Sequence, residues 1–391
     1  MANVQGRYER DVREAFDDGW AHAPGEGSAE EFPRALSESD SLRGSTPDPG
    51  VASDLDKLPP LKTTVTEERA KTILNRNHSP DISFKVSLNP YRGCEHGCIY
   101  CFARPTHSYL GLSPGLDFES RLFAKVNAVE LLRRELAAPN YQPQVIALGI
   151  NTDAYQPIER KLKITRGLIE VLHETSHPFS LLTKSSLIER DVDLLADLAR
   201  KRLVRAAVTI TTLDPGIARK LEPRAASPAR RLRVVRTLAE AGIPMSVNVS
   251  PIIPFITDGE MERILEQAAL AGAGHAHTIV LRLPWELNEV FQQWLQAHFP
   301  LRAERVMNRV REIHGREHGG EKVYDSRFGK RMTGEGVWAD LFRQRFERAC
   351  RALGLNQNAQ PPYDLSLFTK PNVPKVGEMS LKDSPQLDLF G

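Results

Sequence analysis

The sequence has few cysteines, little net charge and no long apolar run. Four of its 391 residues are cysteine, and one of them, Cys350, stands apart from the rest, so a fold held together by disulfides is excluded. The formal net charge of +2 favours no nucleic-acid or acidic partner by bulk attraction alone. No stretch approaches ~18 uninterrupted apolar residues, and MANVQGRYERDVREAF at the start has no apolar signal core. We therefore expect no membrane segment and a soluble, cytoplasmic protein.

The other three cysteines lie within eight consecutive residues of the stretch SLNPYRGCEHGCIYCFARPTHSY, residues 87–109. Cys94, Cys98 and Cys101 have the spacing CxxxCxxC. Thiolates on one short loop suit an iron–sulfur cluster, because their sulfurs can point inward at one cubane while backbone N–H groups bond to its sulfides. Three protein ligands leave one iron open to a substrate or cofactor.

A zinc site completed by His96 or His78 is the alternative for these thiols. Structural zinc sites usually take their ligands from two separated pairs, which keeps the tetrahedron symmetric. The sequence has no second pair. The spacing therefore favours the cluster.

Residues 1–62 are rich in Gly, Ser, Pro, Asp and Glu and show no sustained periodicity. Such a composition buries too little apolar surface to offset the entropy of the chain. We expect a disordered leader here, with one short helix at Tyr8 to Trp20.

From Phe84 onward, β-rich apolar runs alternate with stretches of helical periodicity. The runs that favour strands are Val145–Ile150, Phe179–Thr183, Val204–Thr211, Met245–Val249 and Thr278–Leu283. The helical stretches are Lys125–Leu136, Leu162–Glu174, Asp191–Leu198, Ala229–Ala241 and Asp258–Ala271. This alternation is typical of parallel strands joined by right-handed crossovers. With the strand that enters the cysteine loop there are about six βα units, fewer than the eight of a closed barrel. The sequence therefore predicts an α/β fold, a partial (β/α)6 barrel of the TIM type over residues 63–284.

Helices dominate after Pro284, at Trp285–His298, Arg302–His314 and Val337–Leu353. We predict a helical C-terminal extension over residues 285–360 that caps the barrel, and a flexible tail over residues 361–391. Cys350, on the last helix, is expected to be a small buried apolar residue.

The cysteine stretch resembles the signature of the radical S-adenosylmethionine (SAM) superfamily, CxxxCx(aromatic)C, with Tyr100 as the aromatic residue. The resemblance implies a [4Fe-4S] cluster held by Cys94, Cys98 and Cys101, with an open iron that chelates the amino and carboxylate groups of SAM. It also implies reductive cleavage of SAM to a 5′-deoxyadenosyl radical, driven by a reductant such as flavodoxin or ferredoxin. In such a protein the cofactor supplies the radical chemistry, and the chain supplies position and shielding.

Polar side chains follow three of the predicted strands. Thr152 and Asp153 follow the second strand, Lys184 follows the third, and Thr209 and Thr211 share one face of the fourth. Taken alone, a Thr-Asp pair is often a helix N-cap, and a lysine at a strand end is often merely solvated.

The order of these groups, followed by Glu222-Pro223 and Arg231-Leu232, resembles the spore photoproduct lyase branch of the superfamily, the DNA repair photolyase-like proteins. This likeness covers about residues 84 to 283, and NPYRGCEHGCIYC is similar to a bacterial subgroup. It implies that Tyr100 lies beside the adenine of SAM. It also implies SAM contacts from Thr152, Asp153, Lys184, Thr209 and Thr211.

Two positions depart from spore photoproduct lyase. Ile150 stands where that family has a cysteine that returns a hydrogen atom, and Phe102 stands where it has a relay tyrosine. Neither side chain can donate a weakly bound hydrogen, so a substrate other than spore photoproduct is expected. By chemistry alone, the candidate donors are Tyr100, Tyr109 and Tyr155.

A basic segment between Arg219 and Arg236 holds seven cations against one acid, Glu222. Beside the mouth of a barrel it could neutralise phosphates, and Arg224 and Arg231 are the candidate ligands for substrate phosphate. The solvated face of a helix is the alternative.

The C-terminal QLDLF resembles the peptide by which bacterial DNA polymerases and repair proteins bind the replication sliding clamp. Its anchors would be Gln386, Leu387, Leu389 and Phe390, with the leucines and phenylalanine entering an apolar groove. An ordinary packed tail is the alternative.

Three functions follow from these observations. The first is a radical SAM enzyme that abstracts hydrogen from a nucleic-acid-related substrate, such as damaged or modified DNA. The second is a radical SAM enzyme that acts on tRNA, a peptide or a metabolite. The third is a non-catalytic iron–sulfur module associated with DNA or the clamp.

Overall fold

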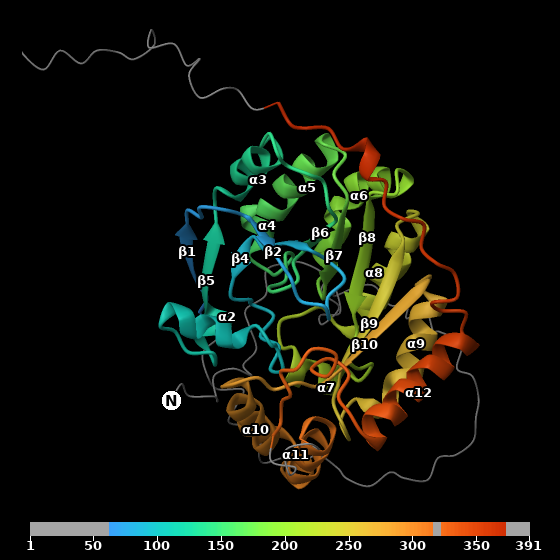
Figure 1. Cartoon of the computed structure of the whole chain (residues 1–391). Helices are drawn as coiled ribbons and strands as arrows, with labels where there is room; N and C mark the ends of the chain where they lie inside the picture. Colours follow the sequence, from blue (N-terminus) through green and yellow to red (C-terminus); the bar gives the residue numbers. More distant parts are fainter. Residues whose placement is uncertain (1–61, 316–321, 373–391) are drawn as a thin grey trace, which may run out of the picture.

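A computed structural model describes residues 62–315 and 322–372 (Figure 1). Its centre is a seven-stranded sheet with the order β10-β9-β8-β7-β6-β3-β2. Its strands are β2 (Leu74–Arg76), β3 (Val86–Leu88), β6 (Ile146–Leu148), β7 (Phe179–Thr183), β8 (Val204–Thr209), β9 (Met245–Ile252) and β10 (His275–Val280). The strands from β3 to β10 are mutually parallel, and β2 is antiparallel to β3. Six parallel strands in chain order confirm the predicted partial barrel.

The barrel is open between its first and last strands, since β2 and β10 end the strand order within the described residues. A loop that precedes α12 (Val337–Ala352) spans this opening. The Met332 carbonyl accepts from Val280 N at 3.2 Å, and Arg331 pairs with Asp81 at 2.6 Å. The loop therefore joins the last strand to the segment between β2 and β3.

A second, three-stranded sheet has the order β1-β5-β4, with β1 (Thr64–Glu68), β4 (Tyr91–Arg92) and β5 (Arg121–Lys125). The sequence analysis predicted none of these strands. β4 lies just before the first cluster cysteine, and β5 follows the loop that contains all three. This small sheet therefore fixes both ends of the cysteine segment.

Helices connect the strands and cover the outside of the sheet (Figure 1). They are α2 (Asp117–Ser120), α3 (Ala128–Leu136), α4 (Glu159–Leu162), α5 (Ile164–Glu174), α6 (Val192–Arg200), α7 (Pro215–Leu221), α8 (Pro228–Glu240) and α9 (Met261–Leu270). Short 3₁₀ segments are η2 (Arg104–Leu110), η3 (Ser186–Asp191), η4 (Asp258–Glu260) and η6 (Leu365–Leu367). Asp214 begins α7 by accepting from Ile217 N at 2.9 Å, and Ser227 caps α8 in the same way. Each cap is followed by a proline, which suits a first helical position.

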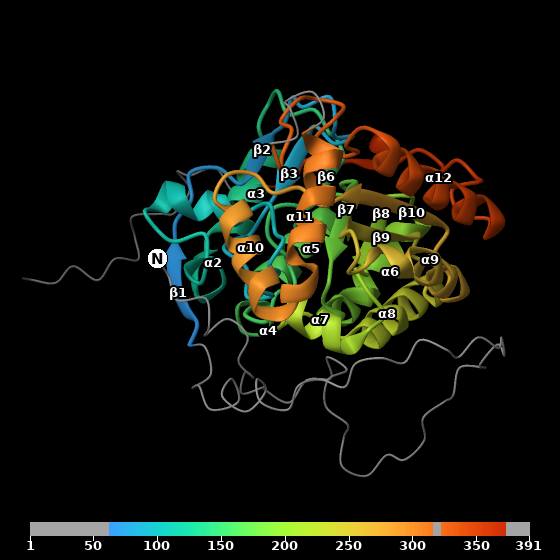
Figure 2. The same ribbon diagram turned by 90° about the horizontal axis from the view of Figure 1, so that it is seen from below.

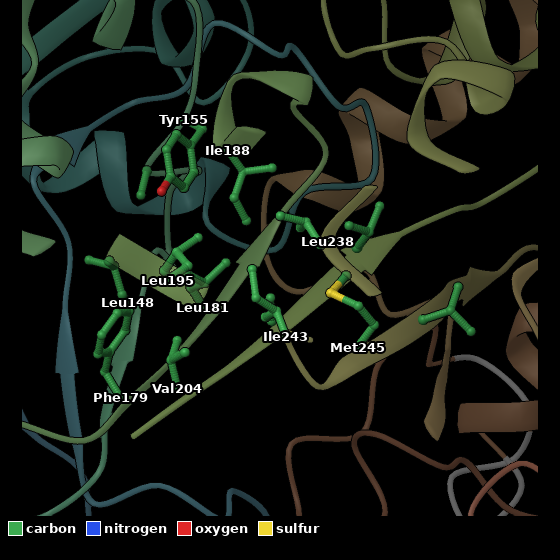
Figure 3. Packing of buried hydrophobic residues seen from close by; sticks show 14 of the residues in the cluster. Leu148, Tyr155, Phe179, Leu181, Ile188, Leu195, Val204, Leu238, Ile243 and Met245 are labelled. Carbon is green, nitrogen blue, oxygen red and sulfur yellow. The ribbon is translucent and has the colours of Figure 1, made fainter. Parts of the chain in front are cut away.

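The main core lies between the sheet and this helical layer. Figure 3 shows side chains of β6 to β9 meeting those of η3, α6 and α8. Phe179, Leu148 and Leu238 are completely buried there. Burying such side chains is worth roughly 1.5–3 kcal/mol each, so the strand ends that carry polar groups rest on a rigid base.

The C-terminal helices α10 (Leu287–His298) and α11 (Pro300–His314) pack together beside the cysteine loop (Figure 2). Trp294 and Phe291 of α10 are completely buried and share an apolar cluster with Cys98 and Tyr100. The Trp294 indole N–H also donates to the Lys220 carbonyl at 3.0 Å. The predicted helical extension thus forms one wall of the cysteine site.

The long predicted elements agree with the structure within a few residues, but two details differ. The last barrel strand ends at Val280 rather than Leu283, so Arg282 lies beyond it. Residues 361–372, placed in the tail by the sequence, instead hydrogen-bond to loops at Arg202 and Thr175. Cys350 is 4% exposed, as expected. The leader, its helix at Tyr8 to Trp20 and the QLDLF segment lie outside the described residues.

None of the helices in residues 62–315 and 322–372 combines the length and the apolar character that crossing a bilayer requires.

Candidate functional site: a three-cysteine loop at the barrel mouth

The three cysteines lie on two successive turns at the carboxyl edge of the parallel strands. Gly97 N donates to the Cys94 carbonyl at 3.3 Å, and Cys101 N donates to the Cys98 carbonyl at 3.2 Å. Cys94 and Cys98 are each 7% exposed, and Cys101 is half-buried. Function concentrates at this edge in parallel barrels, because the loops after the strands converge there.

The three thiols lie close enough to affect one another electrostatically. Burial, and then the charges of Asp153, Cys98 and Cys101, raises the pKa of the Cys94 thiol well above its usual range. Burial raises the pKa of Cys98 to about 12, although the Lys184 ammonium opposes this shift. The buried thiolates of Cys94 and Cys98 are therefore costly without added positive charge, and bound iron would supply it.

The donor set fits an iron–sulfur cluster better than zinc. Within the described ranges, no group of three or more His, Cys, Asp or Glu is arranged to hold a single metal ion. His96, the nearer candidate for a fourth zinc ligand, places Nδ1 3.2 Å from Asp153 Oδ2. A zinc ion would need four donors at about 2.0–2.3 Å, whereas a cluster takes one thiolate at each of three irons.

Arg104 holds the backbone of the cysteine loop from inside the protein. Its guanidinium donates to the carbonyls of Cys98 and Gly97, both at 2.8 Å, and to the Gly115 carbonyl at 2.6 Å. The side chain is completely buried, and it pairs with Glu119 at 3.4 Å. A planar guanidinium suits this role because its fixed fork can bond several carbonyls at once.

Glu119 and Arg224 also support the cysteine loop, together with Arg104. Arg224 Nη2 lies 3.1 Å from Glu119 Oε2, and Arg224 N donates to the His96 carbonyl at 3.3 Å. A Cβ added to Gly97 would lie 2.1 Å from Glu119 Oε2, and the φ of Gly97 is +67°. Only glycine therefore fits at the centre of the loop.

Gly97→Ala is expected to lower iron occupancy after reconstitution at limiting iron by about tenfold, since disturbing groups that orient metal ligands typically costs 10–100-fold in affinity. Iron content and visible absorption of the anaerobic protein measure this effect. The control is Gly111→Ala, where φ is +68° but no atom lies within 4 Å of the added Cβ. Equal iron in both variants would contradict the steric argument.

A second buried ion pair lies on the other side of the loop. Glu222, just after α7, is completely buried and pairs with Arg231 of α8, which is 1% exposed. Glu222 also accepts from the hydroxyls of Tyr100 and Thr211, the latter at 2.8 Å. Burial would raise the pKa of Glu222, but Arg231, Lys184 and the hydrogen bonds to Arg231 and Tyr100 together outweigh it and hold that pKa below its usual range. Glu222 therefore fixes the aromatic residue of the cysteine motif.

Asp153 ties three strand-end loops together. Its carboxylate accepts from Thr183 Oγ1 and Lys184 N, both at 2.8 Å, and from Tyr155 N at 2.9 Å. Burial alone would raise the pKa of Asp153, but the His96 ring and these hydrogen bonds lower it to about 2. The carboxylate is therefore charged and fully engaged with protein groups.

Lys184 presents an ammonium group to the cysteine loop. Its Nζ lies 5.8 Å from the centre of the Tyr100 ring, and it forms no ion pair with any residue in the described part of the chain. Burial would lower the pKa of Lys184, but Cys98, Glu222 and Asp153 outweigh it and raise that pKa. A charged lysine with no carboxylate at ion-pair distance among the described residues suits an incoming carboxylate.

The threonines predicted as SAM contacts are bonded to the protein. Thr152 Oγ1 donates to the Tyr91 carbonyl at 2.9 Å, and the Thr209 carbonyl accepts from Arg231 at 3.0 Å. Thr211 bonds to Glu222. Thr152, Thr209 and Thr211 are each at most 3% exposed. They build the floor of the mouth, and their contact with SAM stays a prediction.

The phosphate-binding role predicted for Arg224 and Arg231 does not fit their geometry. Arg231 lies inside the protein and pairs with Glu222, while the side chain of Arg224 is 10% exposed and pairs with Glu119. Arg230 likewise pairs with Glu189. Three of the seven cations of the basic segment are therefore paired with acids, and two of these acids, Glu119 and Glu189, come from other parts of the fold.

The candidate tyrosines occupy three different environments. Tyr100 is buried beside the loop, Tyr109 is 83% exposed on η2, and Tyr155 is 1% exposed in the main core (Figure 3). Tyr155 therefore cannot meet a substrate as a hydrogen donor in this arrangement. Phe102, at the relay-tyrosine position, lies under Arg282, whose Cζ is 4.4 Å from the ring centre.

This fold and this cysteine loop define a class of protein. The sequence pattern of the radical SAM superfamily matches residues 88–268. The chain belongs to the radical SAM superfamily, whose members use a [4Fe-4S] cluster and SAM.

Among its relatives, the uncharacterized protein Rv2578c of Mycobacterium tuberculosis is 36% identical over 256 residues, which cover 65% of this chain and 74% of that one. The radical SAM Nalpha-GlyT isomerase of Pseudomonas phage M6 is 28% identical over 207 residues, 51% of this chain and 40% of that one. A structure of spore photoproduct lyase complexed with dinucleoside spore photoproduct superimposes with a TM-score of 0.52 at 16% identity, covering 74% of this chain and 80% of that one. This last likeness is one of fold.

Sequence reasoning missed Arg104 and Glu119 as supports of the loop. Arg104 lies three residues after the last cluster cysteine, and Glu119 is fifteen further on. The only sequence signal was an arginine and an acid close to the cysteine motif, a pattern that many surface segments share.

Proposed function

We propose that this protein is a radical SAM enzyme that abstracts a hydrogen atom from a nucleic-acid-related substrate. One observation supports this proposal above the others. Three thiols that suit a cluster lie at the mouth of a partial barrel, next to a lysine ammonium that makes no ion pair among the described residues.

In this proposal, Cys94, Cys98 and Cys101 hold the [4Fe-4S] cluster, and Lys184 pairs with the carboxylate of SAM. A cluster held by these thiolates would supply the one-electron reduction of SAM, with the electron drawn from a reductant such as flavodoxin or ferredoxin.

The remaining residues position and shield the reacting groups. Glu222 and Arg231 hold Tyr100 against the floor of the mouth, where its ring lies below the Lys184 ammonium. Trp294 and Phe291 close the side of the loop and exclude water from it. Such shielding matters because a radical in contact with solvent or with the wrong side chain is lost to side reactions.

The nucleic-acid class of substrate is supported by a protein of the same fold, spore photoproduct lyase, which has been solved with a dinucleoside. Replacement of the donor cysteine and relay tyrosine by Ile150 and Phe102 favours a reaction other than that of spore photoproduct lyase. Binding of QLDLF to a sliding clamp stays a prediction from the sequence.

Anaerobic protein reconstituted with iron and sulfide, then mixed with dithionite and SAM, is expected to release 5′-deoxyadenosine and methionine. Lys184→Met should raise the KM for SAM about tenfold or more, because the SAM carboxylate loses its buried cationic partner, while Lys184→Arg should retain most of the affinity. The control is Lys201→Met, which removes a surface lysine paired with Asp197. An intact cluster that yields no 5′-deoxyadenosine would overturn the proposal.

A further inference from the structure

Four exposed aromatic side chains lie on η2 and on loops at the cysteine end of the barrel. The exposed fractions are 39% for Phe102, 83% for Tyr109, 70% for Trp285 and 60% for Phe328. Large aromatic side chains are usually buried, so a group of exposed ones marks a binding surface. We call these four residues the aromatic rim.

Two contacts connect the cysteine loop to the start of α10. Phe102 directly follows Cys101 in the chain. The Cζ atom of Arg282 lies 4.4 Å from the centre of the Phe102 ring. Ser108 Oγ donates to Glu286 Oε1 at 3.3 Å. Because Ser108 precedes Tyr109 and Glu286 follows Trp285, this bond brings the two exposed rings to neighbouring segments.

Phe328 belongs to the loop that spans the open side of the barrel. Gly329 N donates to Asp81 Oδ1 at 2.6 Å, and Val280 N donates to the Met332 carbonyl at 3.2 Å. The Arg331 guanidinium lies 5.0 Å from the Phe328 ring. These bonds fix Phe328 next to the end of β10, the strand from which Arg282 and Trp285 follow.

The backbone at Trp285 is held in an uncommon conformation. Its φ is +48°, a region that bulky side chains rarely adopt. Such conformations persist where the surrounding structure imposes them, and they are common at functional sites. At Trp285 this conformation accompanies a side chain that is exposed to solvent at the mouth.

Arg282 adds a positive charge to this surface. Apart from its contact with Phe102, it has no ion pair or hydrogen bond with any residue of the described segments. Arg331, by contrast, is paired with Asp81. The guanidinium of Arg282 is thus available to an anion beside the cysteine loop.

We propose that the aromatic rim and Arg282 form a binding surface for unpaired nucleotides, in which bases stack on the rings and a phosphate pairs with the guanidinium. Proteins that bind single strands combine these two features, aromatic rings for the base faces and cations for the backbone. This inference rests on the proposed function, whose substrate class it narrows to single-stranded or locally unpaired nucleic acid.

The kind of side chain favours nucleotides over a protein partner. Exposed aliphatic side chains such as Leu270 at the end of α9 and Leu341 on α12 belong to other elements. A protein interface usually joins aromatic anchors with aliphatic ones, and the rim has only rings and a cation. Every base has a face that can stack on such rings.

The test is the binding of a short labelled single-stranded oligodeoxynucleotide to the reconstituted holoprotein, followed by fluorescence anisotropy. Trp285→Ala and Tyr109→Ala should each weaken binding about tenfold, the typical loss for one stacked base. The matched control is Leu270→Ala, because Leu270 is 71% exposed but precedes β10, at the other end of that strand from Arg282 and Trp285. It should bind like the parent. All three side chains are exposed, so folding should be retained, and circular dichroism and iron content check this.

The salt dependence tests Arg282 separately. Loss of one phosphate contact should reduce the slope of log affinity against log salt by about 0.7 for a single strand. Arg282→Gln should show this reduction, and Trp285→Ala should keep the parent slope. A duplex of the same sequence should bind more weakly than the single strand to the parent, since its bases are already stacked.

Three results would overturn the inference: binding that is the same in the parent and Trp285→Ala, a preference for the duplex, or binding of an acidic peptide in place of the oligonucleotide. These results are distinct from failure of the proposed function. If the protein cleaves SAM but the rim variants bind single strands as well as the parent does, only this inference is wrong. If the rim variants lose binding but the parent never cleaves SAM, only the radical SAM proposal is wrong.

Discussion

Cys98→Ala is expected to abolish both the retention of iron and the cleavage of SAM. Cys98 is the central thiol of the motif. Its carbonyl accepts a hydrogen bond from Arg104, and it belongs to the apolar cluster that contains Trp294. Loss of residues that merely orient a metal ligand costs 10–100-fold, so loss of a ligand should cost roughly a hundredfold or more. Iron content, visible absorption and the yield of 5′-deoxyadenosine measure the effect.

Cys350→Ala is the matched control, because it removes the one thiol outside the motif. Cys350 lies on α12 and is 4% exposed, away from the mouth and packed in the main core. This variant should keep full iron and full activity, with at most a modest loss of stability. If Cys98→Ala kept a cluster and cleaved SAM at the parent rate, the assignment of the cluster ligands would be incorrect.

Glu222→Ala is expected to lower the free energy of unfolding by about 3–5 kcal/mol, because it leaves the buried Arg231 guanidinium without its partner. The hydroxyls of Tyr100 and Thr211 lose their acceptor at the same time. Urea unfolding under anaerobic conditions, followed by circular dichroism, measures this loss. A change of this size would be a large fraction of the stability of a typical protein.

Two comparisons make this prediction specific. Glu189→Ala breaks the pair with Arg230 of α8, in which the Arg230 and Glu189 side chains are 12% and 21% exposed, and should cost less than Glu222→Ala because water still reaches both groups. Replacing both partners of the buried pair, with Glu222→Leu and Arg231→Met together, should recover much of the lost stability, because no unpaired charge remains. If Glu222→Ala and Glu189→Ala had equal effects, the buried pair would not support the cysteine loop as argued.

The metal-binding motif and the order of the barrel could be predicted because both depend on short-range patterns. The spacing of Cys94, Cys98 and Cys101 limits which metal groups one loop can hold. Likewise, strands such as Phe179–Thr183 and helices such as Val337–Ala352 follow from local periodicity, and the structure places both close to their predicted bounds.

The roles of the charged residues could not be predicted in this way. Arg224 and Arg231 looked like ligands for phosphate, because the sequence displays a run of cations without displaying their partners. In the structure, Arg224 pairs with Glu119, which is 105 residues away, and Arg231 pairs with Glu222 inside the protein. Pairing across such a separation depends on how distant segments pack.

The sequence by itself determined the three-thiol motif, the succession of strands and helices, and the family resemblance, since each of these depends on residues close together in the chain. Only the tertiary structure decided which cations support the cysteine loop, which lysine faces it, and that Phe102, Tyr109, Trp285 and Phe328 are exposed near one another. Burial and charge pairing are properties of surfaces brought together by folding, and no local pattern encodes them.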